Sequence, residues 1–305
     1  MKSAARRDFL KTSAGLLGLA LAGRYAARTR RCPLLSFSTL GCPDWTFDEV
    51  LAFARQHGYD GIELRGILRQ LDLPLCPEFS SAEKIRETTR RVQDHQLRIV
   101  DLGASTELHH TEASERQKNL DQARRFIDLA QKIDCPYVRV FPNALPEGDG
   151  RAAIIDLIIE NLVTLGDYAK GSSVSVLMES HGDAVKTAEL RHIMDSAHHP
   201  RVGLVWDIVN MWSVTRQPPR EVYSQLKPYI RHTHVKDLTW VDGKEHYVLL
   251  GKGVAPIFEG LDALFQGGYT GYYSFEWEKL WHPDIDAPEA ALADYPRAMR
   301  DHFKC

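Results

Sequence analysis

The chain has 305 residues, of which 44% are hydrophobic and 26% are charged. This is ordinary globular composition, and the length is enough for one large core or for two ordinary domains. The formal net charge of −3 and the isoelectric point near 6.5 argue against nucleic acid as a partner, because a protein that binds a phosphate backbone needs a basic surface.

The first 27 residues are unlike the rest of the chain. The run RRDFLK at 6–11 precedes an apolar, glycine- and alanine-rich stretch at 12–23, in which 20–22 offers a small-x-small cleavage site. This order is typical of a twin-arginine export signal. About 12 apolar residues are too few to span a bilayer, so we expect no stable membrane anchor after processing. We predict that 1–27 is an export signal and that the mature protein is periplasmic or otherwise exported. A basic start to a cytosolic protein is the alternative.

The cysteines are odd in number and widely spaced, without any C-x-x-C pair. They are Cys32, Cys42, Cys76, Cys135 and Cys305. This spacing is not that of a zinc cluster or a dense disulfide framework, so we expect isolated thiols. An exported protein could form one bridge, but the sequence does not say which cysteines would pair.

Strand-like and helix-like segments alternate through the N-terminal half. Runs of β-branched and aromatic residues predict strands at 34–40, 62–64, 97–102 and 137–141. Apolar residues at helical spacing predict helices at 46–57, 81–95, 114–133 and 151–170. Thr46 followed by Glu49 has the pattern of a capping box at the first of these helices.

Four further strands are predicted in the C-terminal half, and each ends near an acidic residue or a histidine. They are the runs SVSVLMES, RVGLVWD, YIRHTHV and GYYSFEWE, which carry Glu179, Asp207, His234 and Glu276. Segment 208–229 is predicted as a loop and a short helix, and helices are expected at 255–266 and 288–303. Eight such units predict an α/β protein with one domain, a (β/α)₈ TIM barrel over 32–305. A doubly wound open sheet is the alternative, but no G-x-G-x-x-G follows the first strand.

The four strand-end residues predict a metal site at the mouth of the barrel. The carboxyl ends of parallel strands meet at one face, where TIM barrels carry their chemistry. Three carboxylates and one imidazole suit Mn²⁺ best in our interpretation, with Mg²⁺, Co²⁺ or Zn²⁺ as alternatives. Asp207 could instead cap the following helix, and Glu278 could replace Glu276, because side chains two residues apart share a strand face.

A divalent ion at this site would polarise a carbonyl and acidify the adjacent C–H bond. Glu179 and Glu276 come from well-separated strands, so they could act as general bases on opposite faces of a substrate. Removing a proton on one side and returning it on the other is isomerase or epimerase chemistry.

Several motifs in order resemble those of one family. They are TFDEVLAFARQHGYDGIELR at 46–65, then LMESHGD, GLVWDIVN, RHTHVKD, GKG and GGYTGYYSFEWE. Together they are similar to the sugar phosphate isomerase/epimerase superfamily, the xylose isomerase-like TIM barrels, over nearly all of 33–300. The resemblance implies Glu179, Asp207, His234 and Glu276 as metal ligands. It also implies His181 and Lys236 as substrate-contacting or catalytic residues, although Lys236 could be a solvated lysine.

Four other positions are candidates for substrate binding. Glu63 and Arg65 share a strand face and could bind substrate hydroxyls, or they could form an internal ion pair. Asn210 and Trp240 stand where ketose 3-epimerases of this family carry a histidine and an arginine. The run His-Val-Lys-Asp at 234–237 is more similar to inosose dehydratase-type members.

The leading hypothesis is a metal-dependent isomerase or epimerase that abstracts a proton next to a metal-bound carbonyl of a small carbohydrate. The alternative is a lyase or dehydratase that uses the same enolate of a keto-sugar, keto-glycoside or keto-inositol. Apurinic-site endonucleases share this barrel but need more histidines and a basic face, and a non-catalytic carbohydrate-binding barrel would not need the ligand set. A homo-oligomer is compatible with the sequence, which does not set the oligomeric state.

Three further features are open to interpretation. Arg139 is expected inside the barrel as a charge partner for Glu107 or Glu179. The pair His109-His110 is expected in a loop, without the partner spacing of a second metal site. The turn at 251–253 could cradle a phosphate through its backbone amides, or it could be a tight turn only.

Overall fold

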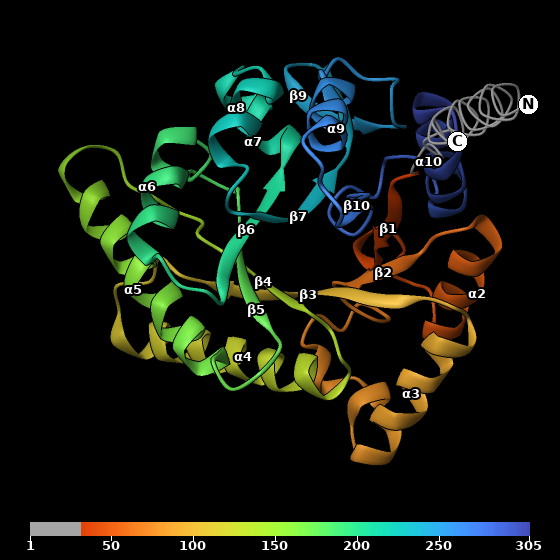
Figure 1. Cartoon of the computed structure of the whole chain (residues 1–305), viewed down its shortest axis with the longest axis horizontal. Coiled ribbons are helices and arrows are strands. Elements are labelled where there is room, and N and C mark those ends of the chain that lie inside the picture. Colours follow the sequence, from red (N-terminus) through yellow and green to blue (C-terminus); the bar gives the residue numbers. More distant parts are fainter. Residues whose placement is uncertain (1–31) are drawn as a thin grey trace, which may run out of the picture.

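The computed structural model describes residues 32–305, so the predicted export signal at 1–27 lies outside the described residues. Eight parallel strands close into a barrel in the order β1-β10-β7-β6-β5-β4-β3-β2, and the helices lie around the outside of the strands (Figure 1). The predicted single-domain TIM barrel is confirmed. Among the described residues, no helix has the length and apolar character needed to cross a membrane.

The barrel strands are short, as expected for buried parallel strands. They are β1 (Leu34–Ser38), β2 (Gly61–Leu64), β3 (Arg98–Glu107), β4 (Tyr137–Phe141), β5 (Ser175–Glu179), β6 (Val202–Asp207), β7 (Ile230–Val235) and β10 (Tyr272–Phe275). All eight lie where the sequence predicts them, although β3 continues to Glu107, five residues past the predicted end at 102.

The helices bury one side against the strands. They are α2 (Phe47–His57), α3 (Ala82–Asp94), α4 (Ala113–Lys132), α5 (Arg151–Ala169), α6 (Thr187–Ala197), α7 (Ile208–Thr215), α8 (Pro219–Leu226), α9 (Ile257–Gln266) and α10 (Pro288–Phe303). The capping box of Thr46 and Glu49 is present at the start of α2. Short 3₁₀ turns lie at Thr39–Gly41, Leu73–Leu75, Pro77–Phe79 and Gly148–Gly150.

Two segments differ from the sequence prediction. Segment 208–229 forms two helices, α7 and α8, instead of a loop and one short helix. An antiparallel hairpin of β8 (Asp237–Val241) and β9 (Lys244–Val248) follows β7. Its turn is Asp242-Gly243, both with positive φ, and an Asp-Gly pair is a strong hairpin signal.

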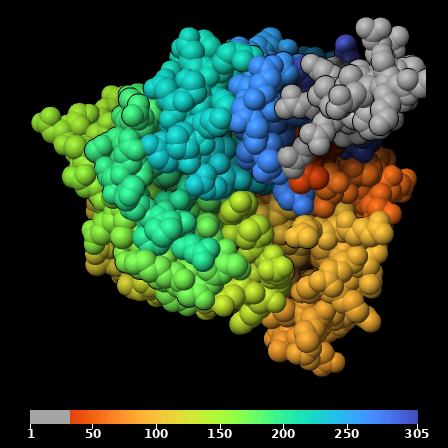
Figure 2. Space-filling view, viewed as in Figure 1, coloured from red at the N-terminus to blue at the C-terminus, as the bar shows by residue number. Residues whose placement is uncertain are grey.

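The start of the barrel is joined to its end. Strand β1 pairs with β10, and Cys32 forms a disulfide with Cys305, their Cα atoms 5.9 Å apart. In Figure 2 the red-orange N-terminal part of the barrel lies beside the blue C-terminal part. The expectation of isolated thiols is therefore wrong for this pair and correct for the other three cysteines, which are free and buried.

The barrel interior is unusually polar at one end. Many charged and polar groups in the barrel strands, or directly after them, are almost completely buried: Glu63, Asp101, Arg139, Glu179, Asp207, His232, His234, Lys236, Ser274 and Glu276. Burying charges is costly unless they are paired or bind a metal. This concentration of buried charge marks the site.

Candidate functional site

Four of these buried side chains converge at the carboxyl end of the barrel. Glu179 and Asp207 are the last residues of β5 and β6. His234 lies in β7, where it pairs with Asp207 of the neighbouring strand, and Glu276 directly follows β10. Each contributes one nitrogen or oxygen atom, and these four atoms all lie within 4.8 Å of one another. The structure brings together the four residues that the sequence predicts as metal ligands.

His234 is held between carboxylates on both sides of its ring. Its Nδ1 lies 3.2 Å from Oε1 of Glu179 and 3.3 Å from Oε1 of Glu276. On the other side, Nε2 donates to Oε2 of Glu63 at 3.0 Å. Burial alone would lower the pKa of His234, but the three carboxylates raise this pKa well above its ordinary value. The proton on Nδ1 occupies the position at which the imidazole would coordinate a cation.

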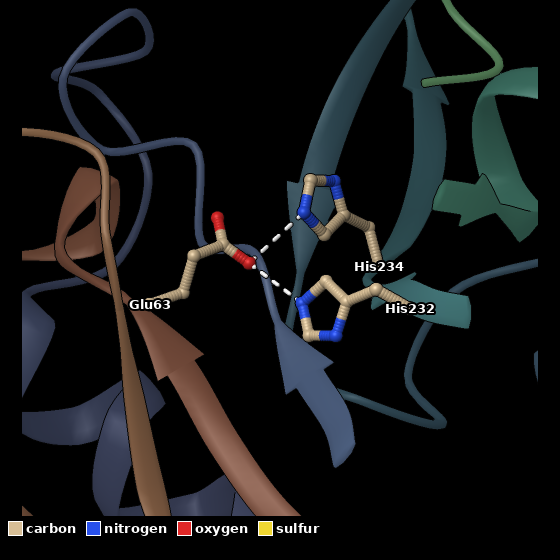
Figure 3. Close-up of side chains that lie close together, drawn as sticks. All are labelled: Glu63, His232 and His234. Carbon is tan, nitrogen blue, oxygen red and sulfur yellow. Dashed lines mark hydrogen bonds and ion pairs between the residues drawn. The ribbon is translucent and has the colours of Figure 1, made fainter. Parts of the chain in front are cut away.

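Glu63 lies beneath the four residues and orients the histidine. Its Oε2 accepts hydrogen bonds from His232 and His234, both at 3.0 Å (Figure 3), and from Ser274 at 3.1 Å. Because a carboxylate can only accept, Nε2 of His234 carries a hydrogen and Nδ1 is the nitrogen that faces the site. A carboxylate behind a histidine is the usual support of a metal ligand.

Glu179 is paired with an arginine inside the barrel. Arg139 Nε lies 3.1 Å from Oε2 of Glu179, and both side chains are about 1% exposed. Burial raises the pKa of Glu179, but the charges of His234 and Arg139 outweigh this and hold the pKa below its ordinary value. Of the two partners expected for Arg139, Glu107 and Glu179, the structure therefore shows Glu179.

Asp207 fills both of the roles considered for it. Its Oδ1 accepts from the backbone N–H groups of Val209 at 3.0 Å and Asn210 at 2.8 Å, which caps helix α7. Its Oδ2 points into the site, 2.8 Å from Nζ of Lys236. Burial raises the pKa of Asp207 to about 6, although Lys236 opposes this. The cap fixes the side chain while one oxygen remains for the site.

Lys236 is buried among carboxylates and is not a solvated lysine. Its Nζ lies 2.8 Å from Asp207 and Glu276 and 2.6 Å from Glu278. Burial would lower the pKa of Lys236, but these carboxylates raise it well above its ordinary value. The ammonium group is therefore a cation and a hydrogen-bond donor. Glu278 contacts Lys236 but does not belong to the four converging residues, whereas Glu276 does and contacts His234. Glu278 therefore does not replace Glu276 in the site.

His181 lies just past the end of β5, beside the site. Its Nδ1 lies 2.8 Å from Oδ1 of Asn143, whose amide group donates to Glu107 at 2.5 Å. The amide oxygen of Asn143 is thus an acceptor, and Nδ1 of His181 is the donor, which leaves Nε2 as the free basic nitrogen. Burial lowers the pKa of His181, so its ring is neutral.

The four predicted substrate-binding residues do not form one group. Glu63 is fully buried against His234, and Arg65 is buried with Nη1 directed at the carbonyl of Gly103, 3.4 Å away. Among the ion pairs of residues 32–305, none joins Glu63 to Arg65. Asn210 lies in the first turn of α7, half-buried and next to the site. Trp240 lies on hairpin strand β8, 38% exposed, with the guanidinium of Arg216 5.0 Å from its ring.

Sequence reasoning missed the supporting role of Glu63 and the presence of Asp101. The register pairs Glu63 of β2 with Asp101 of β3, and both side chains are fully buried. Inward-facing carboxylates on two adjacent strands were the available signal.

The backbone amides of the turn at 251–253 are already hydrogen-bonded within the chain, because the N–H groups of Gly251 and Gly253 donate to Oδ2 of Asp237. Of the two alternatives, a phosphate cradle and a tight turn, the structure shows the tight turn.

Comparison with known proteins identifies the family. The model of the family described as xylose isomerase-like TIM barrel matches residues 51–302. The chain belongs to the xylose isomerase-like TIM barrel family. Among the proteins similar to this chain are some whose names describe an epimerase or a dehydratase.

Relatives of this xylose isomerase-like chain are distant in sequence. A 3-dehydroshikimate dehydratase from Bacillus anthracis is 21% identical over 226 residues, which cover 71% of this chain and 78% of the relative. The crystal structure of the IOLI protein with a bound zinc atom has a TM-score of 0.73 at 18% identity, covering 88% of this chain and 98% of that one. A 3-keto-D-glucoside 4-epimerase from E. coli has a TM-score of 0.67 at 15% identity, covering 90% and 100%. At these identities the solved structures show the shared fold.

The residues present fit a divalent cation. Three carboxylates and one imidazole offer a hard, oxygen-rich donor set with a formal charge of about −3. The site is buried, and its carboxylates are compensated by the protons and cations of His234, Lys236 and Arg139. A second group, Glu63 with His232 and His234, also has its donor atoms close together, but these atoms are already hydrogen-bonded to one another.

Proposed function

We propose that this protein is a divalent-metal-dependent isomerase or epimerase that acts on a sugar or sugar derivative by proton transfer next to a carbonyl. The observation that carries the proposal is the convergence of Glu179, Asp207, His234 and Glu276 within 4.8 Å. This is a ligand set for one ion, and it lies at the end of the barrel where such folds carry their chemistry. We expect a small carbohydrate as substrate.

The ion would be held by one oxygen each of Glu179, Asp207 and Glu276 and by Nδ1 of His234. Mn²⁺ is our first choice, with Mg²⁺, Co²⁺ or Zn²⁺ as alternatives, and zinc is present in one structure of the same fold. When bound, the ion polarises the substrate carbonyl and makes the adjacent C–H bond more acidic.

The carboxylates of Glu179 and Glu276 are the proposed proton carriers. Their strands, β5 and β10, are separated by β6 and β7 in the barrel, so the two groups approach the site from different directions. Each has a pKa held below its ordinary value, by His234 and Arg139 for Glu179 and by His234 and Lys236 for Glu276, against the effect of burial. Both are therefore unprotonated and able to accept a proton from carbon.

Lys236 and His181 would handle charge and protons on the substrate oxygens. The ammonium group of Lys236, 2.8 Å from Glu276, can donate to an oxygen that becomes negative as the proton leaves. The free Nε2 of His181 is a neutral base held in place through Asn143. Asn210 and Trp240 are proposed to contact the substrate from α7 and the hairpin.

A lyase or dehydratase is the second candidate, and one observation favours it. The curated relative is a dehydratase, and loss of a β-hydroxyl begins with the same proton abstraction. The buried Lys236, with the acidic Glu278 2.6 Å away, could supply the proton that a leaving hydroxyl needs. The substrate would then be a keto-sugar, keto-glycoside or keto-inositol.

Incubation of the manganese-loaded protein with keto-sugars and keto-glycosides in D₂O separates the two candidates. An isomerase or epimerase incorporates deuterium next to the carbonyl and conserves the mass of the product apart from this exchange. A lyase releases water or an aglycone. Absence of both exchange and elimination over the whole substrate panel would contradict the proposed proton transfer.

Glu179→Gln and Glu276→Gln test the two proton carriers. Each replacement removes a base of the same size, so we expect turnover to fall by about 10²–10⁴-fold. Glu245→Gln, on the hairpin strand β9, is the control for loss of one carboxylate and should leave turnover unchanged. Two glutamine variants with wild-type turnover would rule out these roles.

We also propose that the protein is exported by the twin-arginine route. The disulfide between Cys32 and Cys305 supports this, because disulfides persist in oxidising compartments. Such cargo folds before transport, which would allow metal loading in the cytoplasm, and few sugar phosphates would be available outside it. Cell fractionation of the wild type and of an R6K/R7K variant tests the proposal, and equal distribution of the two would contradict it.

A further inference from the structure

A second cluster of metal-binding side chains lies at the rim of the barrel, apart from the four-residue site. Glu107 is the last residue of β3, and His109 and His110 follow it. The donor atoms of these three residues lie within 4.8 Å of one another. The sequence prediction that this histidine pair lacks a partner for a metal is therefore wrong, because the extension of β3 to Glu107 brings a carboxylate beside both rings.

The distances in the cluster are those between ligands of one ion. Oε2 of Glu107 lies 3.1 Å from Nε2 of His110 and 4.0 Å from Nδ1 of His109. Two ligands that each lie about 2.1 Å from one ion are about 3.4 Å apart at the tetrahedral angle. The two measured distances lie on either side of this value, so small side-chain rotations would bring all three donors to one centre.

One donor of the cluster lacks any other use in the described chain. Nδ1 of His109 is buried and has no hydrogen-bond partner among residues 32–305, since 4.0 Å is too long for a hydrogen bond to Glu107. A buried ring nitrogen without a partner is costly. The ring of His110 lies 4.2 Å from that of His109, centre to centre, so both imidazoles approach Glu107 together.

The other oxygen of Glu107 is held from behind. Oε1 accepts from the side-chain amide of Asn143 at 2.5 Å, which fixes the carboxylate with Oε2 directed at the histidines. A hydrogen-bonded carboxylate is typical of an oriented metal ligand. His109 and His110 also line an open surface pocket of about 420 Å³, together with Glu112 and Pro146. A ligand or water in this pocket could complete the coordination.

We propose that Glu107, His109 and His110 form a second, separate metal site, which takes Zn²⁺ or Co²⁺. Two imidazoles and one carboxylate beside an open pocket form a donor set that suits these ions. Asn143 joins Glu107 to His181 through one amide group. The rim cluster and His181 therefore share one hydrogen-bonded amide group.

Metal stoichiometry tests this proposal. The full chain is stripped with a chelator, loaded with excess Zn²⁺, freed of unbound ion by gel filtration, and analysed for zinc by mass spectrometry. We expect the H109A/H110A variant to bind one equivalent less than the wild type. Glu107→Gln, which keeps the size of the side chain and one hydrogen bond to Asn143, is expected to lose the same equivalent. The first 31 residues contain neither histidine nor cysteine, so they offer no competing ligands of these types.

The controls separate this site from the central one. His192→Ala removes an exposed imidazole from α6 and should keep the wild-type stoichiometry. Glu276→Gln should reduce binding at the barrel centre while the equivalent that depends on His109 and His110 is retained. Circular dichroism and a Co²⁺ titration followed by visible absorption confirm folding and imidazole ligation. Unchanged zinc content in folded H109A/H110A protein would overturn the proposal, whatever metal the barrel centre binds.

Discussion

At the scale of single residues, the site depends on how each buried carboxylate divides its two oxygens. Asp207 uses Oδ1 to cap α7 and leaves Oδ2 for the site. Oε2 of Glu179 contacts Arg139, and its Oε1 contacts His234. One oxygen of each group is fixed by the fold, and the other is available to an ion. The geometry is therefore preorganised by contacts that persist without the ion.

Glu63→Gln tests the orientation of His234. The replacement keeps the size of the side chain but removes the charge that Nε2 of His234 meets at 3.0 Å. Loss of such a supporting carboxylate typically lowers metal affinity by about 10–100-fold, and we expect this loss for Mn²⁺ measured by calorimetry. Ser274→Ala removes another partner of Glu63 without touching His234, and it should have a smaller effect. Equal affinities in wild type and Glu63→Gln protein would contradict the supporting role.

Asp101→Asn tests the cost of a buried carboxyl group. Both oxygens of Asp101 are buried without a hydrogen-bond partner among residues 32–305. Burial, reinforced by Glu63, raises its pKa from 3.8 to about 8. Between these two values the folded chain binds a proton that the unfolded chain has lost. The free energy of unfolding of the wild type must therefore fall as pH rises through this window.

We expect the stability of Asp101→Asn relative to the wild type to increase between pH 4 and pH 8 by at least about 1 kcal/mol, the order of one pKa unit. Urea unfolding at a series of pH values measures this difference. Asp94→Asn, at an exposed position at the end of α3, is the control and should show no such trend. Parallel pH profiles for wild type and Asp101→Asn would show that Asp101 carries no raised pKa.

At the scale of elements, the disulfide joins Cys32, ahead of β1, to Cys305, the second residue after α10. It closes a loop that contains the whole described chain, residues 32–305, which restricts the unfolded state. We expect reduction, or Cys305→Ser, to lower the free energy of unfolding by about 2–4 kcal/mol in chemical denaturation. Reductant should have no further effect on Cys305→Ser. If reductant leaves the wild-type stability unchanged, the bridge does not contribute.

The barrel strands were predictable, and the connections between them were less so. The run that precedes Asp207 in β6 is buried on both faces, so it is continuously apolar and is recognised without knowledge of its neighbours. The second helix after β6 and the hairpin after β7 depend on local capping and on the Asp242-Gly243 turn. Those signals are short, and the expectation of strictly alternating strands and helices concealed them.

The candidate site was predictable once the barrel was predicted. Parallel strands end at one face, so residues such as Glu179 and Asp207 had to meet once the fold was known. Which group orients His234 depends on contacts across the barrel, between β2 and β7, and no spacing in the sequence specifies them. Glu63 was accordingly expected to bind substrate, although the structure places it beneath the ligands.

At the scale of the whole molecule, the fold encloses a strongly charged centre. The barrel end buries Glu63, Glu179, Asp207 and Glu276 against a few cations. Excess negative charge in a protein interior must be compensated by protons, cationic side chains or a bound cation. In this structure the positive charges of Lys236 and of the protonated His234 compensate the carboxylates. A bound divalent ion would take over this compensation.

Anomalous diffraction from crystals grown with Mn²⁺ tests the central claim most directly. We predict a manganese peak at the carboxyl end of the barrel, within about 2.0–2.4 Å of an oxygen of Glu179, Asp207 and Glu276 and of Nδ1 of His234. The side chain of Lys236 should move away from Asp207 and Glu276. No manganese peak among these four side chains, in crystals that contain the ion elsewhere or in excess, would contradict the account.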